Sequence, residues 1–123
     1  MFWNSKAPVY PKVPDQYFPP DVVERIKENY PDLKDQQNVA STLNKLIDEL
    51  ELSGPRIIRC ILFASGDDIS EFKRCVQVAK DDWRDIIGEA EYENGKHIYN
   101  FNEPFAEARM KEGEVFKGPR SKR

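Results

Sequence analysis

Histidine is nearly absent from this sequence, with His97 as the one example in 123 residues. Metal sites of the di-iron kind in helical bundles use paired Glu-x-x-His motifs, and the sequence contains none. Cysteine is also scarce, and Cys60 and Cys75 do not form a Cys-x-x-Cys pair. Both lie in helical patterns beside apolar neighbours, where cysteine behaves as a small buried hydrophobic residue. We therefore expect two reduced thiols, no metal site, and a hydrogen-bonded or surface His97 rather than a Cys–His catalytic dyad.

Glycine-rich phosphate loops are missing as well, because Gly54 and Gly66 are single glycines at expected helix boundaries. This predicts a protein without a nucleotide or any other cofactor. No apolar run approaches the roughly 18 residues of a membrane helix, so no membrane partner is expected. The first residues lead into prolines rather than an apolar segment, which predicts no secretory signal and a cytoplasmic location. The pI near 5.3 argues against nucleic acid as a partner.

Proline is concentrated at the front of the chain, and residues 1–19 form a predicted arm. Prolines at this spacing exclude a helix interior and favour extended backbone. The arm also carries more aromatic residues than a disordered linker does, so we expect part of it to dock on its own domain or on a neighbouring copy. Its aromatic residues are Phe2, Trp3, Tyr10, Tyr17 and Phe18.

Helical periodicity dominates residues 20–102, which predicts one all-α domain built as a small bundle of about four helices. The first helix begins at Pro20 and stops before Pro31. The second is expected to be capped by Asp35, and its apolar positions follow the 3.6-residue period. Those positions are Val39, Leu43, Leu46, Ile47 and Leu50.

Residues 56–64 are apolar almost all round and predict a buried helix, with a buried strand as the rival interpretation. The longest predicted helix follows, over residues 69–90, and begins at a capping-box pair formed by Asp68 and Glu71. It carries one apolar stripe, made of Ile69, Phe72, Val76, Ala79, Trp83, Ile86, Ile87 and Ala90.

The pair Asn94-Gly95 can end this helix or turn a β-hairpin, and we predict the helix end because the apolar stripe already uses Ala90. Residues 96–101 would then run extended across the bundle. From residue 103 to residue 123 the composition is polar and locally basic, which predicts a loose tail. No internal repeat is visible.

Residues 81–93 are the most charged part of the chain, and Asp82, Asp85 and Glu89 share one face of the predicted helix. A solvated helix face is the favoured interpretation, with a cation site or a docking surface for a basic partner as alternatives. Trp83 belongs to the apolar stripe and is predicted to fill the core, with the rim of a pocket or interface as the alternative.

Arg56 and Arg59 interrupt the otherwise apolar helix over residues 56–64. They are predicted to mark its one solvent-facing edge. The alternative is that they pair with carboxylates of the long helix inside the domain, which would make a buried pair that is costly to break.

Two stretches carry a resemblance: Arg-Cys-Ile-Leu-Phe-Ala-Ser-Gly-Asp at 59–67 and Asp-Trp-Arg-Asp-Ile-Ile-Gly-Glu-Ala-Glu-Tyr at 82–92. Through them, residues 55–92 resemble short bacterial proteins of a family of unknown function. The resemblance covers under a third of the chain. It implies a compact cytoplasmic bacterial protein, brings no activity to any position, and directs attention to the second stretch.

These observations predict a non-enzymatic helical module that binds another protein or a second copy of itself. The alternatives are a small ligand-binding protein or hydrolase with a carboxylate and arginine pocket, which also uses His97, and an inhibitor or immunity-type protein with an acidic docking face. No catalytic residue is assigned. The candidate binding residues are Arg59, Asp82, Trp83, Arg84, Asp85, Glu89 and Tyr92.

Overall fold

A computed structural model describes residues 18–111. Five α-helices make up most of this part of the chain, and its one sheet is a hairpin of two short strands, which confirms the prediction of an all-α fold. The chain divides into two compact units between Ser53 and Gly54. No helix among the described residues is long and apolar enough to cross a membrane.

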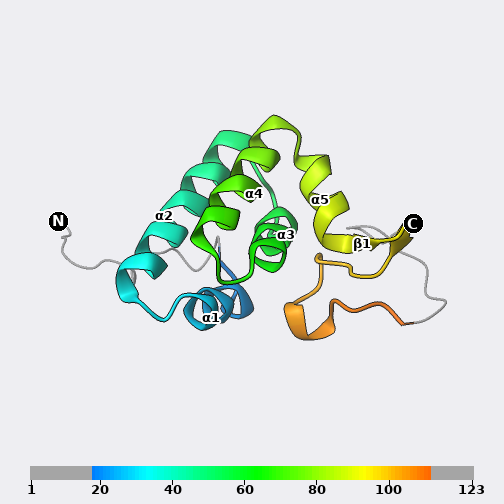
Figure 1. Ribbon diagram of the computed structural model, residues 1–123, viewed down its shortest axis with the longest axis horizontal. Helices are drawn as coiled ribbons and strands as arrows, with labels where there is room; N and C mark the ends of the chain where they lie inside the picture. Colours follow the sequence, from blue (N-terminus) through cyan, green and yellow to red (C-terminus); the bar gives the residue numbers. More distant parts are fainter. Residues whose placement is uncertain (1–17, 112–123) are drawn as a thin grey trace. The chain divides into compact units, whose positions relative to one another are not determined.

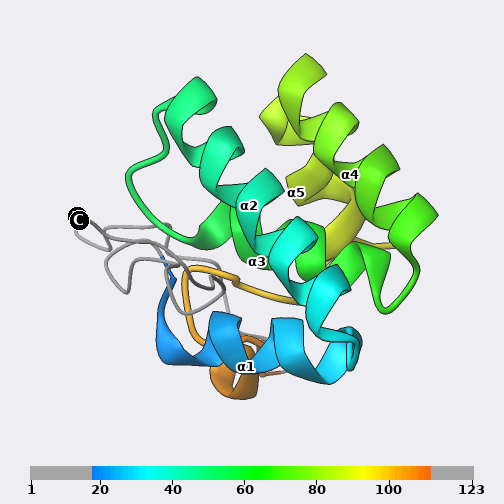
Figure 2. The same cartoon turned by 90° about the vertical axis from the view of Figure 1, so that its left-hand side faces the viewer.

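The first unit contains α1 (Pro20–Asn29) and α2 (Leu33–Leu50), which pack against each other. Figure 2 shows the two helices meeting at a short connection and crossing at a steep angle. The start of α1 at Pro20 agrees with the prediction, whereas α2 begins earlier than we expected. Asp32, rather than Asp35, caps α2 by accepting hydrogen bonds from the N–H groups of Lys34 and Asp35.

The apolar positions of these two helices are mostly buried, as their periodicity predicts. Val23 and Leu50 are half-buried, and Leu33 at the start of α2 is exposed. The buried apolar residues of α1 and α2 are Val22, Ile26, Val39, Ala40, Leu43, Leu46 and Ile47. Of the predicted arm, residues 1–17 lie outside the described part. Phe18, just before α1, is 1% exposed.

The second unit contains α3 (Arg56–Ser65), α4 (Ile69–Asp81) and α5 (Trp83–Glu91), with α3 packed against both of the other helices (Figure 1). The run over residues 56–64 is therefore a helix and not the rival strand. Its side chains are almost all buried, as an apolar surface on every side requires. Asp68 caps α4 through the N–H groups of Ser70 and Glu71, which confirms the predicted helix start.

The predicted long helix over residues 69–90 is wrong in one respect, because it is broken at Asp82. Asp82 has extended backbone, with φ −163° and ψ 105°, and its side chain accepts a hydrogen bond from the N–H of Arg84. This residue ends α4 and caps α5 at once. Residues 18–111 consequently contain five α-helices rather than about four.

The expectation that Asn94-Gly95 ends a helix without forming a hairpin is also wrong. Strands β1 (Tyr92–Glu93) and β2 (Lys96–His97) pair antiparallel across this turn. Asn94 has φ 53° and Gly95 has φ 80°, and two left-handed residues are what a two-residue hairpin turn requires. The chain therefore reverses directly after α5.

Residues 103–111, which we expected to begin a loose tail, contain regular structure. The short 3-10 helix η2 (Phe105–Glu107) is followed by a β-bridge between Tyr99 and Arg109. The N–H of Met110 donates to the carbonyl of Ile98 and that of Asn100 donates to the carbonyl of Ala108. The remainder of the predicted tail, residues 112–123, lies outside the described part.

Candidate functional site

Glu91 is a fully buried carboxylate at the centre of the second unit, with 0% of its surface exposed. Its Oε1 accepts hydrogen bonds from Arg56 Nη2 at 2.6 Å and from His97 Nε2 at 2.8 Å. Its Oε2 accepts from Arg56 Nε at 2.9 Å, from the N–H of Phe101 at 3.0 Å and from the thiol of Cys60 at 3.8 Å. A buried charge of this kind is tolerated because paired and hydrogen-bonded groups replace its lost hydration.

The position of Glu91 follows from the local fold. It is the last residue of α5, and its backbone carbonyl accepts hydrogen bonds from the N–H groups of Ile98 and Tyr99. Side chain and main chain of this residue therefore both hold the segment that returns from the hairpin. Orphan carbonyls at a helix end need such partners when they are not exposed to water.

The ionisation of Glu91 is set by two opposed effects. Burial alone would raise the pKa of the carboxyl group, but hydrogen bonds from Arg56, the Phe101 N–H and His97 outweigh burial and hold this pKa below its usual value. Glu91 is therefore ionised at neutral pH. Arg56 supplies the compensating charge through a two-point contact with both carboxylate oxygens.

Cys60 and Cys75 are free, fully buried thiols, as predicted for small hydrophobic residues. Burial, and then the negative charge of Glu91, raise the pKa of the Cys60 thiol. Burial also raises the pKa of Cys75. A nucleophilic cysteine needs a lowered pKa and access to solvent, and the structure gives neither thiol these properties.

The structure corrects our expectation that the two arginines of α3 face solvent. They were predicted to mark a solvent-facing edge, but Arg59 is 3% exposed and Arg56 pairs with the buried Glu91. For Arg56 the structure agrees with the alternative of an internal ion pair, because its partner Glu91 lies at the end of α5. Arg59 Nη1 donates to the carbonyl oxygens of Phe101 at 3.1 Å and Asn102 at 3.2 Å.

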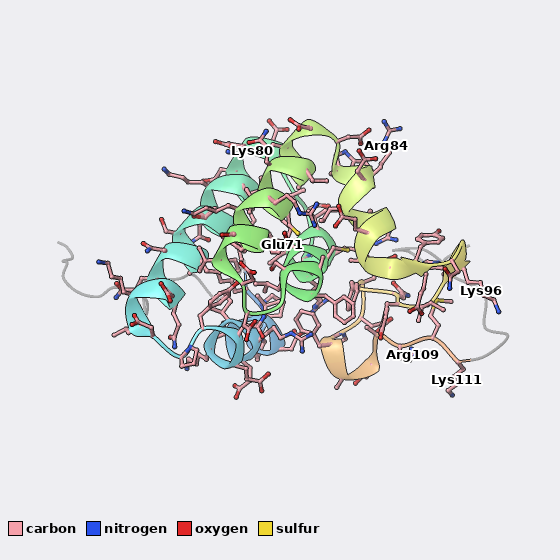
Figure 3. The ribbon with its side chains drawn as sticks, in the orientation of Figure 1. Glu71, Lys80, Arg84, Lys96, Arg109 and Lys111 are labelled. Carbon is pink, nitrogen blue, oxygen red and sulfur yellow. The ribbon has the colours of Figure 1, made fainter. Side chains whose placement is uncertain are left out.

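Trp83 does not fill the core, contrary to the prediction from the apolar stripe. It is 48% exposed at the first position of α5, because the break at Asp82 rotates the stripe before this residue is reached. Tyr92, at the other end of α5, is 45% exposed and stacks on the ring of His97 with a centroid distance of 4.4 Å. In Figure 3, Arg84 lies at the start of α5 and Lys96 lies on the hairpin that follows this helix.

The acidic candidates share one helical face only in part. Asp85 and Glu89 lie four residues apart within α5 and are therefore on one face, as predicted. Asp82 lies at the break before α5 and not inside one continuous helix. Asp82 pairs with Arg84 at 2.9 Å, whereas Glu89 pairs with Arg74 of α4 at 2.8 Å.

Of the seven predicted binding residues, the structure brings Asp82, Trp83, Arg84 and Asp85 together at the α4–α5 corner and places the other three elsewhere. Sequence analysis weighed Arg56 as one half of an internal pair, but it did not single out Glu91 as the partner. One signal for Glu91 was present, because it lies four residues after Ile87, on the apolar side of α5. A charge at such a position needs an internal partner.

No group of three or more His, Cys, Asp or Glu residues suited to a metal ion occurs between residues 18 and 111. Comparison with family models, with curated proteins and with solved structures gives no match to this chain.

Proposed function

We propose that this protein is a non-enzymatic, self-associating helical module, and that two copies meet at the α4–α5 corner. The observation that carries the proposal is Trp83, a tryptophan with 48% of its surface exposed. Tryptophan, tyrosine and arginine dominate the energetics of protein interfaces because they bury large areas and keep a polar group. An exposed tryptophan at a helix corner offers such an anchor.

The charges beside Trp83 favour a second copy as the partner. Asp82 and Arg84 flank it with opposite charges, and their side chains are 35% and 73% exposed. A two-fold symmetric contact uses the same patch on both copies, so a residue at the centre meets its own counterpart and residues to either side of the centre meet each other. Within one chain Asp82 and Arg84 pair with each other at 2.9 Å. Placed face to face around Trp83, two copies can exchange these pairs, so that Asp82 of one copy meets Arg84 of its partner.

Tyr92 is the weaker candidate for the anchor, although it is almost as exposed as Trp83. Its ring already stacks on His97, with the two ring planes 3° apart. One face of the tyrosine is therefore used within the chain. Trp83 has no corresponding stacking contact among the described residues.

Three of the charged groups that a pocket for catalysis or ligand binding would use are held by contacts within the chain. Arg59 binds backbone carbonyls, Glu89 binds Arg74, and His97 binds Glu91. This arrangement supports the choice of a binding module over a hydrolase. The ligand-binding or hydrolase alternative and the inhibitor alternative with an acidic face stay predictions, as does exchange of the arm over residues 1–19.

Sedimentation equilibrium of the full chain tests the proposal. The wild-type protein should show a mass of about twice 14.3 kDa, and Trp83→Ala should return it to the monomer. Leu33→Ala is the matched control, because Leu33 is another large apolar residue with 58% exposure, on the first unit. This control should leave the mass unchanged.

Charge reversal adds a second readout. Arg84→Glu removes the attraction between copies and sets two negative charges against each other, so it should weaken association more than Arg84→Gln does. A wild-type chain that sediments as a monomer at every concentration measured sinks the proposal. A dimer that survives Trp83→Ala places the contact elsewhere.

A further inference from the structure

The turn between β1 and β2 places an asparagine directly before a glycine on an exposed surface. Asn94 and Gly95 are both exposed, and they form the one Asn-Gly pair in the sequence. A methyl group added to Gly95 would meet nothing within 4 Å, so the space beside this residue is open. In Figure 3, Lys96, the residue after this turn, lies at the outer edge of the second unit. Water therefore reaches the Asn94 side chain and the peptide bond that follows it.

The turn is held by a short ladder. The two pairs between β1 and β2 are Tyr92 with His97 and Glu93 with Lys96. Of these four residues, only His97 is partly buried. Short, exposed elements open at a lower cost in free energy than the buried helices of the same unit. The Asn94 side chain can therefore change its conformation and approach the main chain beside it while α3, α4 and α5 stay folded.

An asparagine side chain in this setting can react with the main chain that follows it. The main-chain nitrogen of Gly95 attacks Cγ of Asn94 and closes a succinimide ring. The side-chain nitrogen leaves as ammonia, which carries the proton that Gly95 loses. Glycine has no Cβ, so nothing on Gly95 obstructs this approach. Water then opens the ring at one of its two carbonyl carbons. One opening leaves aspartate with a normal main chain, and the other leaves isoaspartate, whose main chain runs through the former side chain.

We propose that Asn94 is a site of spontaneous deamidation, and that its isoaspartate product releases His97 from Glu91. The two products differ in their effect on the hairpin. Aspartate at position 94 keeps the main chain unchanged, and Asp-Gly suits a two-residue turn as Asn-Gly does. Isoaspartate adds one main-chain atom to the turn. Because the length of the turn fixes the pairing of the strands, this additional atom shifts β2 against β1.

The contacts of His97 depend on this pairing. Its ring stacks on the ring of Tyr92 with the centroids 4.4 Å apart, and its Nε2 lies 2.8 Å from Oε1 of Glu91. The side chain of His97 is 13% exposed and that of Glu91 is 0% exposed, so their contact is largely shielded from water. A shift of β2 moves the imidazole out of both contacts. Glu91 keeps its ion pair with Arg56, so the helices stay packed while the hairpin is released.

Incubation of the full-length wild type tests the reaction. The protein is kept in a mildly alkaline buffer, and peptide mass spectrometry follows the replacement of NH2 by OH at each asparagine. The matched control lies within the same chain, because Asn38 is also exposed but is followed by Val39, whose branched side chain obstructs the attack. Position 94 should convert, and position 38 should not. Conversion of Asn94 that is no faster than that of Asn38 overturns the proposal.

The effect on the hairpin is measured at His97, because the one histidine of the chain gives one imidazole signal in a proton NMR spectrum. The isoaspartate form is compared with the variant Asn94→Asp, which carries the same charge on a normal main chain. The isoaspartate form should show a shifted imidazole signal, because the ring of Tyr92 no longer stacks on it. Asn94→Asp should keep the position of the wild-type signal. A signal that moves equally in both forms, or in neither, overturns the proposed release of His97.

Discussion

The carboxylate of Glu91 is surrounded by donors from two parts of the chain, the distant helix α3 and the segment that follows the hairpin. Arg56 precedes it by 35 residues, and His97 and Phe101 follow it by six and ten. Removing one partner of a buried ion pair leaves the other partner charged and without compensation. The stability of the second unit should therefore depend strongly on this one side chain.

Glu91→Gln is expected to lower the free energy of unfolding by about 3–5 kcal/mol, measured by urea denaturation. The control is Glu89→Gln, which removes a carboxylate from an ion pair whose partners are 37% and 46% exposed. Water screens such a pair, so this change should cost less than about 1 kcal/mol. Equal effects of the two substitutions would contradict the role given to Glu91.

At the scale of single residues, the sequence predicted which side chains are buried better than it predicted which charged side chains form ion pairs. Cys60, Cys75 and the apolar positions of α2 follow from periodicity, because a residue's helical face depends only on its near neighbours. The partners of Glu91 depend on the fold of the whole second unit, and no local pattern contains them. Trp83 was misplaced for a related reason, since the stripe continues across a break that periodicity does not detect.

At the scale of elements, the hairpin after α5 decides where the rest of the second unit goes. Its turn uses Gly95 at φ 80°, a conformation that costs other residues about 1–2 kcal/mol. Gly88, in contrast, lies inside α5, and an added methyl group there would meet nothing within 4 Å. The two glycines should therefore respond to alanine with opposite signs.

Gly95→Ala should destabilise the protein by about 1–2 kcal/mol, and Gly88→Ala should stabilise it by about 0.5–1 kcal/mol. Thermal unfolding followed by circular dichroism measures both. Both substitutions add one methyl group to the second unit. An effect of the methyl group that did not depend on backbone conformation would therefore change the stability in the same direction at both positions. Stabilisation by Gly95→Ala would mean that the turn does not form as described.

The elements themselves were largely readable from the sequence. Pro20 and Asp68 gave the starts of α1 and α4, and the apolar periodicity gave the faces of α1, α2 and α4, all through local chemistry. The break at Asp82 was missed because the apolar stripe over residues 69–90 also fits one continuous helix. An aspartate that can cap a helix does not by itself indicate a break inside such a stripe. The hairpin was missed because Asn-Gly serves both a helix end and a tight turn.

At the scale of the whole molecule, the two thiols report on the opening of the second unit from two different helices. Cys60 lies on α3 beside Glu91 and Cys75 lies on α4, and both are fully buried. If α3, α4 and α5 open as one cooperative body, a thiol reagent should modify both cysteines with the same free energy of opening. Peptide mass spectrometry of native protein treated with the reagent measures the two rates separately. Faster modification of Cys60 alone would show that the segment after the hairpin opens by itself.

Acid should destabilise the folded protein by protonating carboxylates that form ion pairs with arginines. Hydrogen bonds lower the pKa of Glu89, through Arg74, and of Asp82, through Arg84, and the pKa of Glu91 is lowered despite its burial. A lowered folded-state pKa means that the unfolded chain binds more protons in this range, so stability increases with pH there. The stabilisation is fully present above the unfolded value, which is 4.5 for glutamate, and is lost as the pH falls through the folded value.

The free energy of unfolding should accordingly be nearly constant between about pH 7 and pH 5.5 and should decrease below that range. Glu91→Gln removes the most deeply buried of these carboxylates, so the variant's curve should be lower at neutral pH and should fall less steeply in acid. The two curves should therefore converge as the pH decreases. Curves separated by a constant amount from pH 7 to pH 3 would show that Glu91 stabilises the fold by packing and not by its charge.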